Sequence, residues 1–478
     1  MAAARTLVCT AGVAIVLLAF PAAAADDAPR ANEKAHQQGK IEVARPKGYD
    51  ERRESTAAKI VVGRDELQRF GDETVADVLR RLPGVTVSAE GGVALRGLGG
   101  GYTQVLLDGQ PMPPGFSIES ISPDMIERIE IFRAPTAEHS TQAVAGTINI
   151  VLRKSASHLE RSAKLSAGTT NGRPSLKADG EIAGRAGPLS YTVTASIAHD
   201  EYRNSTLVEQ VGRDALGNLT SVVVTPEPSS GRTDSLSLAP RLEWKLAPGH
   251  TLAWESFAQA SRWMGFFHEN ARTLVGDPPP YPRNELTIDQ HSAAARTSLA
   301  WSRALAEGAK VESKLSYNYY WRHYETPWAA YDDAGTHILD RNVHAVADVD
   351  GLVWTGKYTA PFMPGHALSF GWDGKADRRA EDRVQTDITF AGEPPLVIDE
   401  SYDARVRQLA LYGQDEWEFA PRASAYLGLR WEGLETRSVG NVVGKVANRS
   451  SVWSPIVQAL WKLPGTEKDQ VRAALART

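Results

Sequence analysis

The sequence predicts a mainly β protein, with a small α+β domain followed by a long antiparallel region that crosses a membrane as a β-barrel. Two observations carry this prediction. From about Leu159 onward, apolar and polar residues alternate, which places one set on each face of a sheet. Tight turns also alternate with long polar connections, the pattern of an outer-membrane barrel. A soluble sandwich alternates too, but it has no reason to sort its connections by length.

The N-terminal residues 1–25 are predicted to be a secretory signal peptide. Arg5 supplies a short positive region, residues 13–20 an apolar core, and Ala23-Ala24-Ala25 a cleavage site of small residues. A membrane-spanning anchor is the alternative, but the apolar run is shorter than the ~20 residues that an anchor needs. The chain's one cysteine, Cys9, lies in this segment, so no disulfide or cysteine metal site is expected in the mature chain.

Residues 26–55 are predicted to be a flexible N-terminal segment. Residues 26–38 are polar, rich in alanine and without periodicity. A short extended stretch follows, because a proline restricts the residue before it to an extended conformation. Such a stretch can add a strand to the sheet edge of a partner, and a plain linker is the alternative. The stretch consists of Ile41, Glu42, Val43, Ala44, Arg45 and Pro46.

Residues 56–155 are predicted to form the small α+β domain. Apolar residues at positions 75, 78, 79 and 82 line one face of a helix, which Pro83-Gly84 ends. A second helix is expected to start at Ser122-Pro123. Short strands are expected at 59–62, 85–87, 93–95, 103–107, 129–131 and 148–152.

Residues 156–478 are predicted to form the barrel. Alternation is clearest at 189–197, 311–322 and 425–432. Tight turns are expected at Ala247-Pro248-Gly249, Ala306-Glu307-Gly308, Met363-Pro364-Gly365 and Ala420-Pro421-Arg422. Longer polar connections are expected near 204–232, 264–287, 325–345 and 384–402.

Five short motifs follow one another between Thr74 and Lys154, and together they identify a family. In this order they resemble the plug domain of TonB-dependent outer-membrane receptors. Residues 412–417 and 427–432 similarly resemble barrel strands of these receptors. The motifs are Ala76-Asp77-Val78-Leu79-Arg80-Arg81-Leu82-Pro83-Gly84-Val85, Leu95-Arg96-Gly97, Val105-Leu106-Leu107-Asp108-Gly109, Ile126-Glu127-Arg128-Ile129-Glu130-Ile131-Phe132-Arg133-Ala134-Pro135 and Ala145-Gly146-Thr147-Ile148-Asn149-Ile150-Val151.

The resemblance implies a receptor in the outer membrane of a Gram-negative cell, expected as a monomer in contact with outer-membrane lipid. It implies uptake of a scarce extracellular ligand, most often a ferric siderophore, with cobalamin, haem, nickel chelates and oligosaccharides as alternatives. The TonB–ExbB–ExbD complex would supply the energy by binding the TonB box, for which Ile41–Pro46 is the candidate. The alternation gives about thirteen strands, against about 22 in a plugged transporter barrel. We therefore expect an incomplete version of a longer protein, which as it stands would not insert and transport.

The resemblance also implies two sets of site residues. Plug loops face the outside beneath the ligand, which makes Tyr102, Gln104, Met112 and Phe116 candidate apical ligand-binding residues; packing of the two aromatic rings between plug and barrel is equally open. Plug charges pair with the inner barrel wall in similar receptors. The candidates for this role are Arg96, Glu127, Arg128 and Arg133, with a solvated helix end as the alternative.

Several other functions have little support in the sequence. The net charge of −5 and the lack of a basic stripe argue against nucleic-acid binding. Gly97-Leu98-Gly99-Gly100-Gly101 lacks the lysine of a phosphate loop and precedes a strand instead of a helix. The eleven histidines show no compact ligand pair, so no metal site and no cofactor are predicted. No catalytic arrangement stands out, so the protein is not expected to be an enzyme.

Two rival functions use the same β architecture. A passive porin or surface adhesin would need neither a plug nor a TonB box, and the plug motifs count against it. An outer-membrane hydrolase would need a catalytic residue set that no motif nominates. Deleting Ile41–Pro46 separates active from passive entry, since passive entry would persist.

Overall fold

The computed structural model describes most of the chain after residue 55. The described residues are 56, 59–69, 74–82, 84–88, 92–98, 101–112, 118, 121, 125–140, 143–153, 159–390, 392–442, 444–463 and 469–477. The predicted signal peptide, the candidate TonB box Ile41–Pro46, the apical candidate Phe116 and the helix start at Ser122-Pro123 lie outside the described residues.

The N-terminal domain (residues 56–153) is the predicted small α+β unit. Its helix α3 begins after Thr74, whose hydroxyl accepts from the amide of Asp77 while the Asp77 carboxylate accepts from the amide of Thr74, a reciprocal cap. Its elements are β1 (Lys59–Gly63), α2 (Arg64–Gln68), α3 (Val75–Arg80), β2 (Val85–Val87), β3 (Val93–Leu95), β4 (Thr103–Leu107), β5 (Gln110–Pro111), β6 (Ile126–Phe132) and β7 (Gly146–Leu152).

Five of these strands form one sheet in the order β1-β6-β7-β4-β5, and β2 pairs with β3 in a separate hairpin. The core lies between this sheet and α3. The side chains of Val75, Val78 and Leu79, on the predicted face of α3, are buried in one apolar cluster with Ile129 and Ile148 of the sheet. The sequence periodicity therefore identified the residues that hold this domain together.

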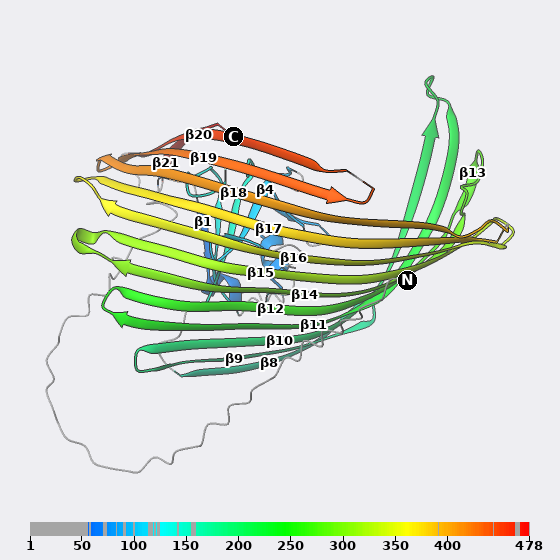
Figure 1. The fold of residues 1–478 in the computed structure, drawn as a ribbon, viewed down its shortest axis with the longest axis horizontal. Helices are drawn as coiled ribbons and strands as arrows, with labels where there is room; N and C mark the ends of the chain where they lie inside the picture. The colour runs from blue at the N-terminus through cyan, green and yellow to red at the C-terminus, as the bar shows by residue number, and fades with distance from the viewer. Residues whose placement is uncertain are drawn as a thin grey trace, which may run out of the picture. The chain divides into compact units, whose positions relative to one another are not determined.

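The rest of the described chain forms one large antiparallel sheet (Figure 1). Thirteen strands follow one another along it from β8 to β21, and β13 pairs with β11 off this path. The strands are β8 (Glu160–Thr170), β9 (Arg173–Ala186), β10 (Leu189–Arg213), β11 (Leu219–Ala247), β12 (His250–Asn270), β13 (Arg272–Val275), β14 (Arg283–Ala304), β15 (Lys310–Tyr331), β16 (His337–Pro361), β17 (His366–Thr389), β18 (Leu396–Ala420), β19 (Ala423–Gly440), β20 (Val446–Lys462) and β21 (Gln470–Ala476), with a short 3-10 helix η3 (Ala306–Gly308) between β14 and β15.

The four predicted tight turns are present, but the predicted long connections are wrong. Residues 204–232 belong mostly to β10 and β11, which pair without interruption from Leu189 to Gly212 and turn at residues 214–218. β11 alone has 29 residues, whereas about 9–11 residues cross a membrane as a strand. The polar residues do not end β10 and β11, because each strand continues to hydrogen-bond with the other along this stretch. In Figure 1, the far part of this hairpin projects beyond the other strands.

The two faces of the large sheet differ as the alternation predicts. On the inner face, defined here as the one that contacts the N-terminal domain, Ser190, Thr192, Thr194 and Ser196 are buried. On the outer face, apolar side chains are exposed. Leu352, for instance, is 51% exposed. Along the described part of the chain, no helix is long and apolar enough to span a bilayer.

Candidate functional site

Two segments of the N-terminal domain each make several hydrogen bonds to the inner face of the large sheet, and the pairs Thr56–Ser424 and Arg153–Glu181 add further contacts. The first is the hairpin between β4 and β5, whose turn is Asp108-Gly109. Both turn residues have a positive φ, 49° for Asp108 and 79° for Gly109, the conformation of a two-residue type I′ turn. The Asp-Gly sequence thus creates a sharp projection that can reach the wall.

Strands β14, β15 and β16 hold this hairpin through polar side chains. Arg296, 4% exposed, donates hydrogen bonds to the backbone carbonyls of Leu107 and Pro111 and to Asn318 at 2.7 Å. Gln110, 1% exposed, accepts from the Ser316 hydroxyl and lies 3.4 Å from the Thr355 hydroxyl. The hairpin is therefore held to the sheet by hydrogen bonds among side chains that are themselves buried.

Burial also affects the turn carboxylate. The pKa of Asp108 is raised by its burial, against the opposing charge of Lys314. The carboxylate accepts the amide of Leu152 at 2.9 Å, and the ammonium of Lys314 bonds the Asp108 carbonyl oxygen at 3.4 Å and Glu255 at 2.7 Å. Protonation of this turn would therefore change a charged network shared by domain and wall.

The second attached segment is residues 135–140, which follow β6. Arg430 on β19 is fully buried and donates to the carbonyls of Ala137 at 3.0 Å and Glu138 at 3.4 Å. The Tyr426 hydroxyl accepts the amide of Ala137 at 2.7 Å. Gln458 on β20 donates to the Pro135 carbonyl at 2.7 Å. Backbone groups that belong to no ladder are thus satisfied by wall side chains.

A partly exposed ion pair and a histidine complete this segment. Lys357 lies 2.6 Å from the Glu138 carboxylate. Burial works against ionisation of Glu138, but the charges of Lys357 and His139 and the hydrogen bond from Lys357 together outweigh it, so the pKa of Glu138 lies below its usual value. Burial lowers the pKa of the neighbouring His139. Its ring contacts Phe132 edge-on at 4.7 Å, and its Nε2 has no hydrogen-bond partner among the described residues.

Between the two attached segments lies a cavity of about 740 Å³. Its lining is largely polar and charged, and residues of the domain and of the wall contribute to it together. The charged lining residues include Lys59, Asp108, Glu138, Lys314, Lys357 and Glu416. A polar space of this kind can hold water beside the domain, so few apolar contacts would be lost if the domain shifted there.

The apical candidates fall in different surroundings. Tyr102 is 52% exposed, just before β4. Gln104 lines the cavity, and its side-chain oxygen is buried without a hydrogen-bond partner among the described residues. Met112 is partly buried and packs against the core of the N-terminal domain. The structure therefore does not bring these three side chains together at one surface.

The charged candidates have contacts inside the N-terminal domain. Arg96 donates to the carbonyl of Arg133 at 2.5 Å, and Arg128 pairs with Glu130 at 2.7 Å. Glu127 and Arg128 lie on strand β6, so the alternative of a helix end is wrong. The contacts between the N-terminal domain and the large sheet include the side chains of Gln110, Glu138 and Arg153 and several backbone carbonyls.

The sequence contained a weak signal for the wall residues that were missed. Arg430 shares the polar phase of its strand with Tyr426 and opposes the apolar phase of Leu427 and Leu429. Its partners lie almost 300 positions away in the sequence, so alternation could give its face but not its contact.

Comparisons with known proteins match both parts of the chain. The family model described as TonB-dependent Receptor Plug Domain matches residues 51–147. The model described as TonB dependent receptor-like, beta-barrel matches residues 189–478, more than half of the chain. The chain belongs to the TonB-dependent receptor family. The N-terminal domain is thus a plug, and the large sheet is outer-membrane barrel wall. The family consists of transport receptors, not enzymes.

Individual relatives are distant. The iron-regulated outer membrane virulence protein of Vibrio cholerae is 24% identical over 435 residues, which cover 87% of this chain and 56% of that protein. The vitamin B12 transporter BtuB of Vibrio vulnificus is 31% identical over 126 residues, covering 24% of this chain and 21% of that protein. The crystal structure of the siderophore receptor PiuA from Acinetobacter baumannii aligns with a TM-score of 0.59 at 14% identity, covering 88% of this chain and 64% of that one.

The first two of these matches cover different shares of the proteins compared. The match to the V. cholerae protein covers most of this chain but only about half the length of that protein. The match to BtuB is local. The likeness to PiuA concerns the fold.

Proposed function

We propose that this protein takes up an iron chelate, a ferric siderophore, across the outer membrane in a TonB-dependent manner. The observation that carries the proposal is the way the plug is seated. Polar contacts at residues 107–111 and 135–140 hold it to the wall, and a polar cavity lies between them. Such a seat holds the plug against the wall at rest, yet its hydrogen bonds can be exchanged for bonds to water when the plug moves.

Moving the plug requires work, and the outer membrane has no supply of ATP. The proposed source is the TonB–ExbB–ExbD complex, which would bind Ile41–Pro46 as an added strand. Tension on a chain that enters the domain at β1 would reach β6 directly, because the two strands pair from Lys59–Phe132 to Gly63–Arg128. β6 leads without another element into the segment held by Arg430.

The similarity to an iron-regulated outer membrane protein supports an iron chelate as the ligand. Cobalamin, haem, nickel chelates and oligosaccharides are the other ligands of this kind of receptor, and they are the competing outcomes of a binding experiment. Tyr102 is proposed as the apical contact, because its aromatic side chain is exposed. Gln104, Met112 and Phe116 are proposed with it, on the weaker ground of their place in the plug.

The test is uptake of radiolabelled ferric siderophore by the native host carrying variants of the chromosomal gene. Deletion of Ile41–Pro46 should abolish accumulation, because the partner loses its strand. Deletion of Ala31–His36, a segment of equal length from the same part of the chain, should leave it unchanged.

Persistence of uptake in the first variant would contradict the energised mechanism and favour a passive porin. Loss in both would mean that the deletion acts through export or folding, which surface labelling of the protein checks directly. Saturable uptake of cobalamin or haem, with none of the siderophore, would replace the ligand while keeping the mechanism.

A further inference from the structure

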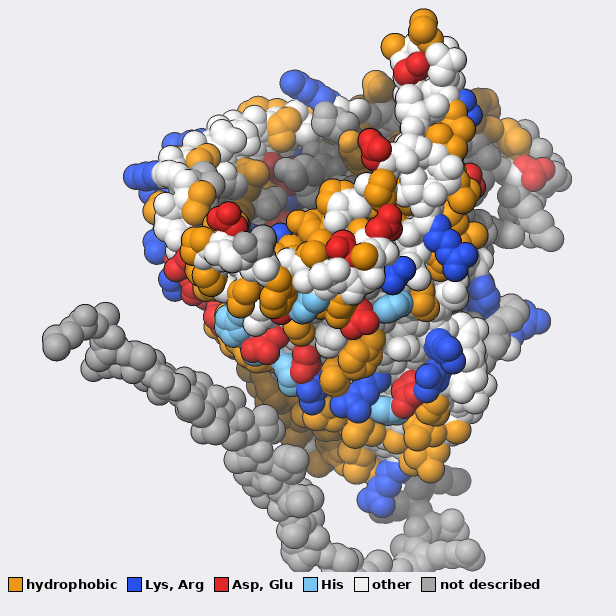
Figure 2. Space-filling model, turned by 90° about the vertical axis from the view of Figure 1, so that its right-hand side faces the viewer, with side chains coloured by type: hydrophobic (Ala, Val, Ile, Leu, Met, Phe, Trp, Pro, Cys, Tyr) orange, Lys and Arg blue, Asp and Glu red, His pale blue; other side chains and the backbone are white. Residues whose placement is uncertain are grey.

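A group of histidine and acidic side chains lies on the outer face of the large sheet, away from the plug. On β15, Ser316 and Asn318 point to the inner face and are buried, so residues of odd number point outward. His323 and Glu325 belong to this outward set. The space-filling view shows histidine side chains gathered among acidic and basic ones, next to an apolar surface (Figure 2).

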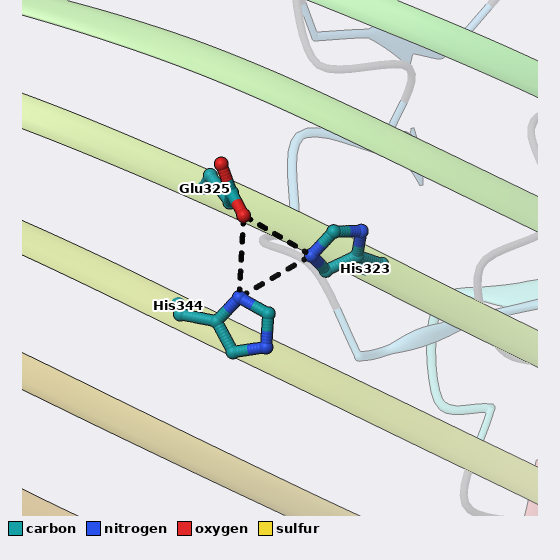
Figure 3. A group of neighbouring side chains, drawn as sticks. All are labelled: His323, Glu325 and His344. Atoms are coloured by element: carbon teal, nitrogen blue, oxygen red, sulfur yellow. Dashed lines mark hydrogen bonds and ion pairs between the residues drawn. The ribbon is translucent and has the colours of Figure 1, made fainter. Parts of the chain in front are cut away.

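Strand pairing brings His344 of β16 to the same place. Glu325 and His344 are direct cross-strand partners, and His323 is two residues before Glu325 on the same face. The three side chains converge (Figure 3). Nε2 of His323 lies 3.3 Å from Nδ1 of His344 and 3.8 Å from a Glu325 oxygen, which is 3.5 Å from Nδ1 of His344.

These separations match one face of a metal coordination sphere. Zinc binds histidine nitrogen and carboxylate oxygen at about 2.0–2.2 Å, so ligand atoms around a tetrahedral ion stand about 3.3–3.6 Å apart. Three atoms 3.3–3.8 Å apart therefore surround a point at bonding distance from all of them with small adjustments. The backbone ladder fixes the spacing, because the pairing of β15 with β16 is regular through this region.

We propose that His323, Glu325 and His344 form a binding site for a divalent first-row transition-metal ion, with Zn²⁺ as the best-fitting ion. Two imidazoles and one carboxylate are a ligand set that such ions accept, and Mg²⁺ or Ca²⁺ would prefer oxygen ligands alone. The side chains are 28–55% exposed, so a fourth position stays open to water or an external anion.

The position of the site suggests what it does. The outward-facing residues that precede His323 on β15 form an apolar and aromatic run. They are Leu315, Tyr317, Tyr319 and Trp321. Aromatic residues mark the edge of the hydrocarbon layer, so the ion would sit at the level of the lipid headgroups. At that level the bound ion would link β15 to β16, and its fourth coordination position would face the anionic lipid headgroups.

A neighbouring histidine helps to fix the position of His323. His291 on β14 is the cross-strand partner of His323, and their rings stack with centroids 6.3 Å apart. His291 in turn lies 3.4 Å from Asp289. The packed ring restricts the rotamers of His323, which lowers the entropy that metal binding would cost.

The experiment measures Zn²⁺ binding to the full-length protein in detergent, purified without a histidine tag, by competition with a fluorescent chelator. We expect one tight site. His344→Ala, His323→Ala and Glu325→Gln should each weaken it by about 100-fold or more, since even loss of an indirect ligand contact costs 10–100-fold. His268→Ala is the matched control, because His268 faces Glu285 at 3.4 Å and, within the described part of the chain, belongs to no group of three such ligands.

Substitution of Co²⁺ gives a second readout that does not depend on affinity. Visible d–d absorption bands of a four- or five-coordinate ion should appear in the parent and the His268→Ala protein and be absent in His344→Ala. Absence of a tight site in the parent protein would overturn the proposal. So would an equal loss of binding in His268→Ala, which would point to unspecific surface binding.

Discussion

Replacing Arg430 by alanine should release the plug segment 135–140 from the barrel wall. The guanidinium is fully buried, donates to the carbonyls of Ala137 and Glu138, and lies 2.9 Å from the Glu432 carboxylate, which is itself 3% exposed. Alanine removes both hydrogen bonds to the plug and the cation facing a buried carboxylate. The plug backbone there has no ladder to replace them.

The expected effect on the seated plug is about 3 kcal/mol. Each of the two hydrogen bonds from the guanidinium to a plug carbonyl contributes about 1.5–3 kcal/mol, because the donor is charged. The lower end applies here, because Ser140 also contacts Glu432 and the charged cavity lies close by. A loss of about 3 kcal/mol raises the open population of this segment about 100-fold.

Hydrogen exchange followed by mass spectrometry measures this population. The amide of Ala137, which donates to the Tyr426 hydroxyl in the resting structure, should exchange about 100-fold faster in Arg430→Ala. Arg437→Ala is the control, since Arg437 lies on the same strand, is 60% exposed and pairs with Glu435 on the wall. An unchanged exchange rate at Ala137, or an equal increase in both variants, would refute the assigned role of Arg430.

Three other substitutions test the plug itself. The pKa of His139 is lower in the folded protein than its usual 6.5, so the unfolded chain takes up the proton first as the pH falls. Stability is therefore lost as the pH falls below 6.5. His139→Phe should reduce the fall in melting temperature between pH 7 and pH 5. Gly146→Ala should destabilise the plug by about 2 kcal/mol in urea unfolding, because φ is +129° and a Cβ would overlap the carbonyl oxygen of Phe132. Gln110→Ala should lower the urea midpoint of the plug by the equivalent of about 1 kcal/mol, whereas an unchanged midpoint would show that its bond to the wall contributes nothing.

Local features of the fold were predictable from the sequence. The apolar face of α3, the Asp108-Gly109 turn and the inward serines and threonines of β10 follow from periodicity and turn chemistry. These features depend on residues within a few positions of one another. The pattern also gave the number of strands along the path of the sheet.

Features that depend on pairing between distant strands were not predictable. Polar residues 204–232 looked like a connection, because nothing local shows that a partner strand continues beside them. A search for closely spaced histidines found no ligand pair, yet His323 and His344 meet because of the register of β15 with β16. The contacts of Arg430 with the plug likewise follow from how the sheet wraps the domain.

The seating of the plug against the wall is tested most directly by a disulfide between the two. The hydroxyl oxygens of Thr56, on the plug side, and Ser424, on β19, are 2.8 Å apart, so Thr56→Cys with Ser424→Cys places two sulfurs within bonding reach. We expect this pair to crosslink spontaneously in cells, seen as a mobility shift that reductant reverses. Thr56→Cys with Ser438→Cys, farther along the same strand, should not crosslink. Failure of the first pair to crosslink, or equal crosslinking of both, would contradict the account.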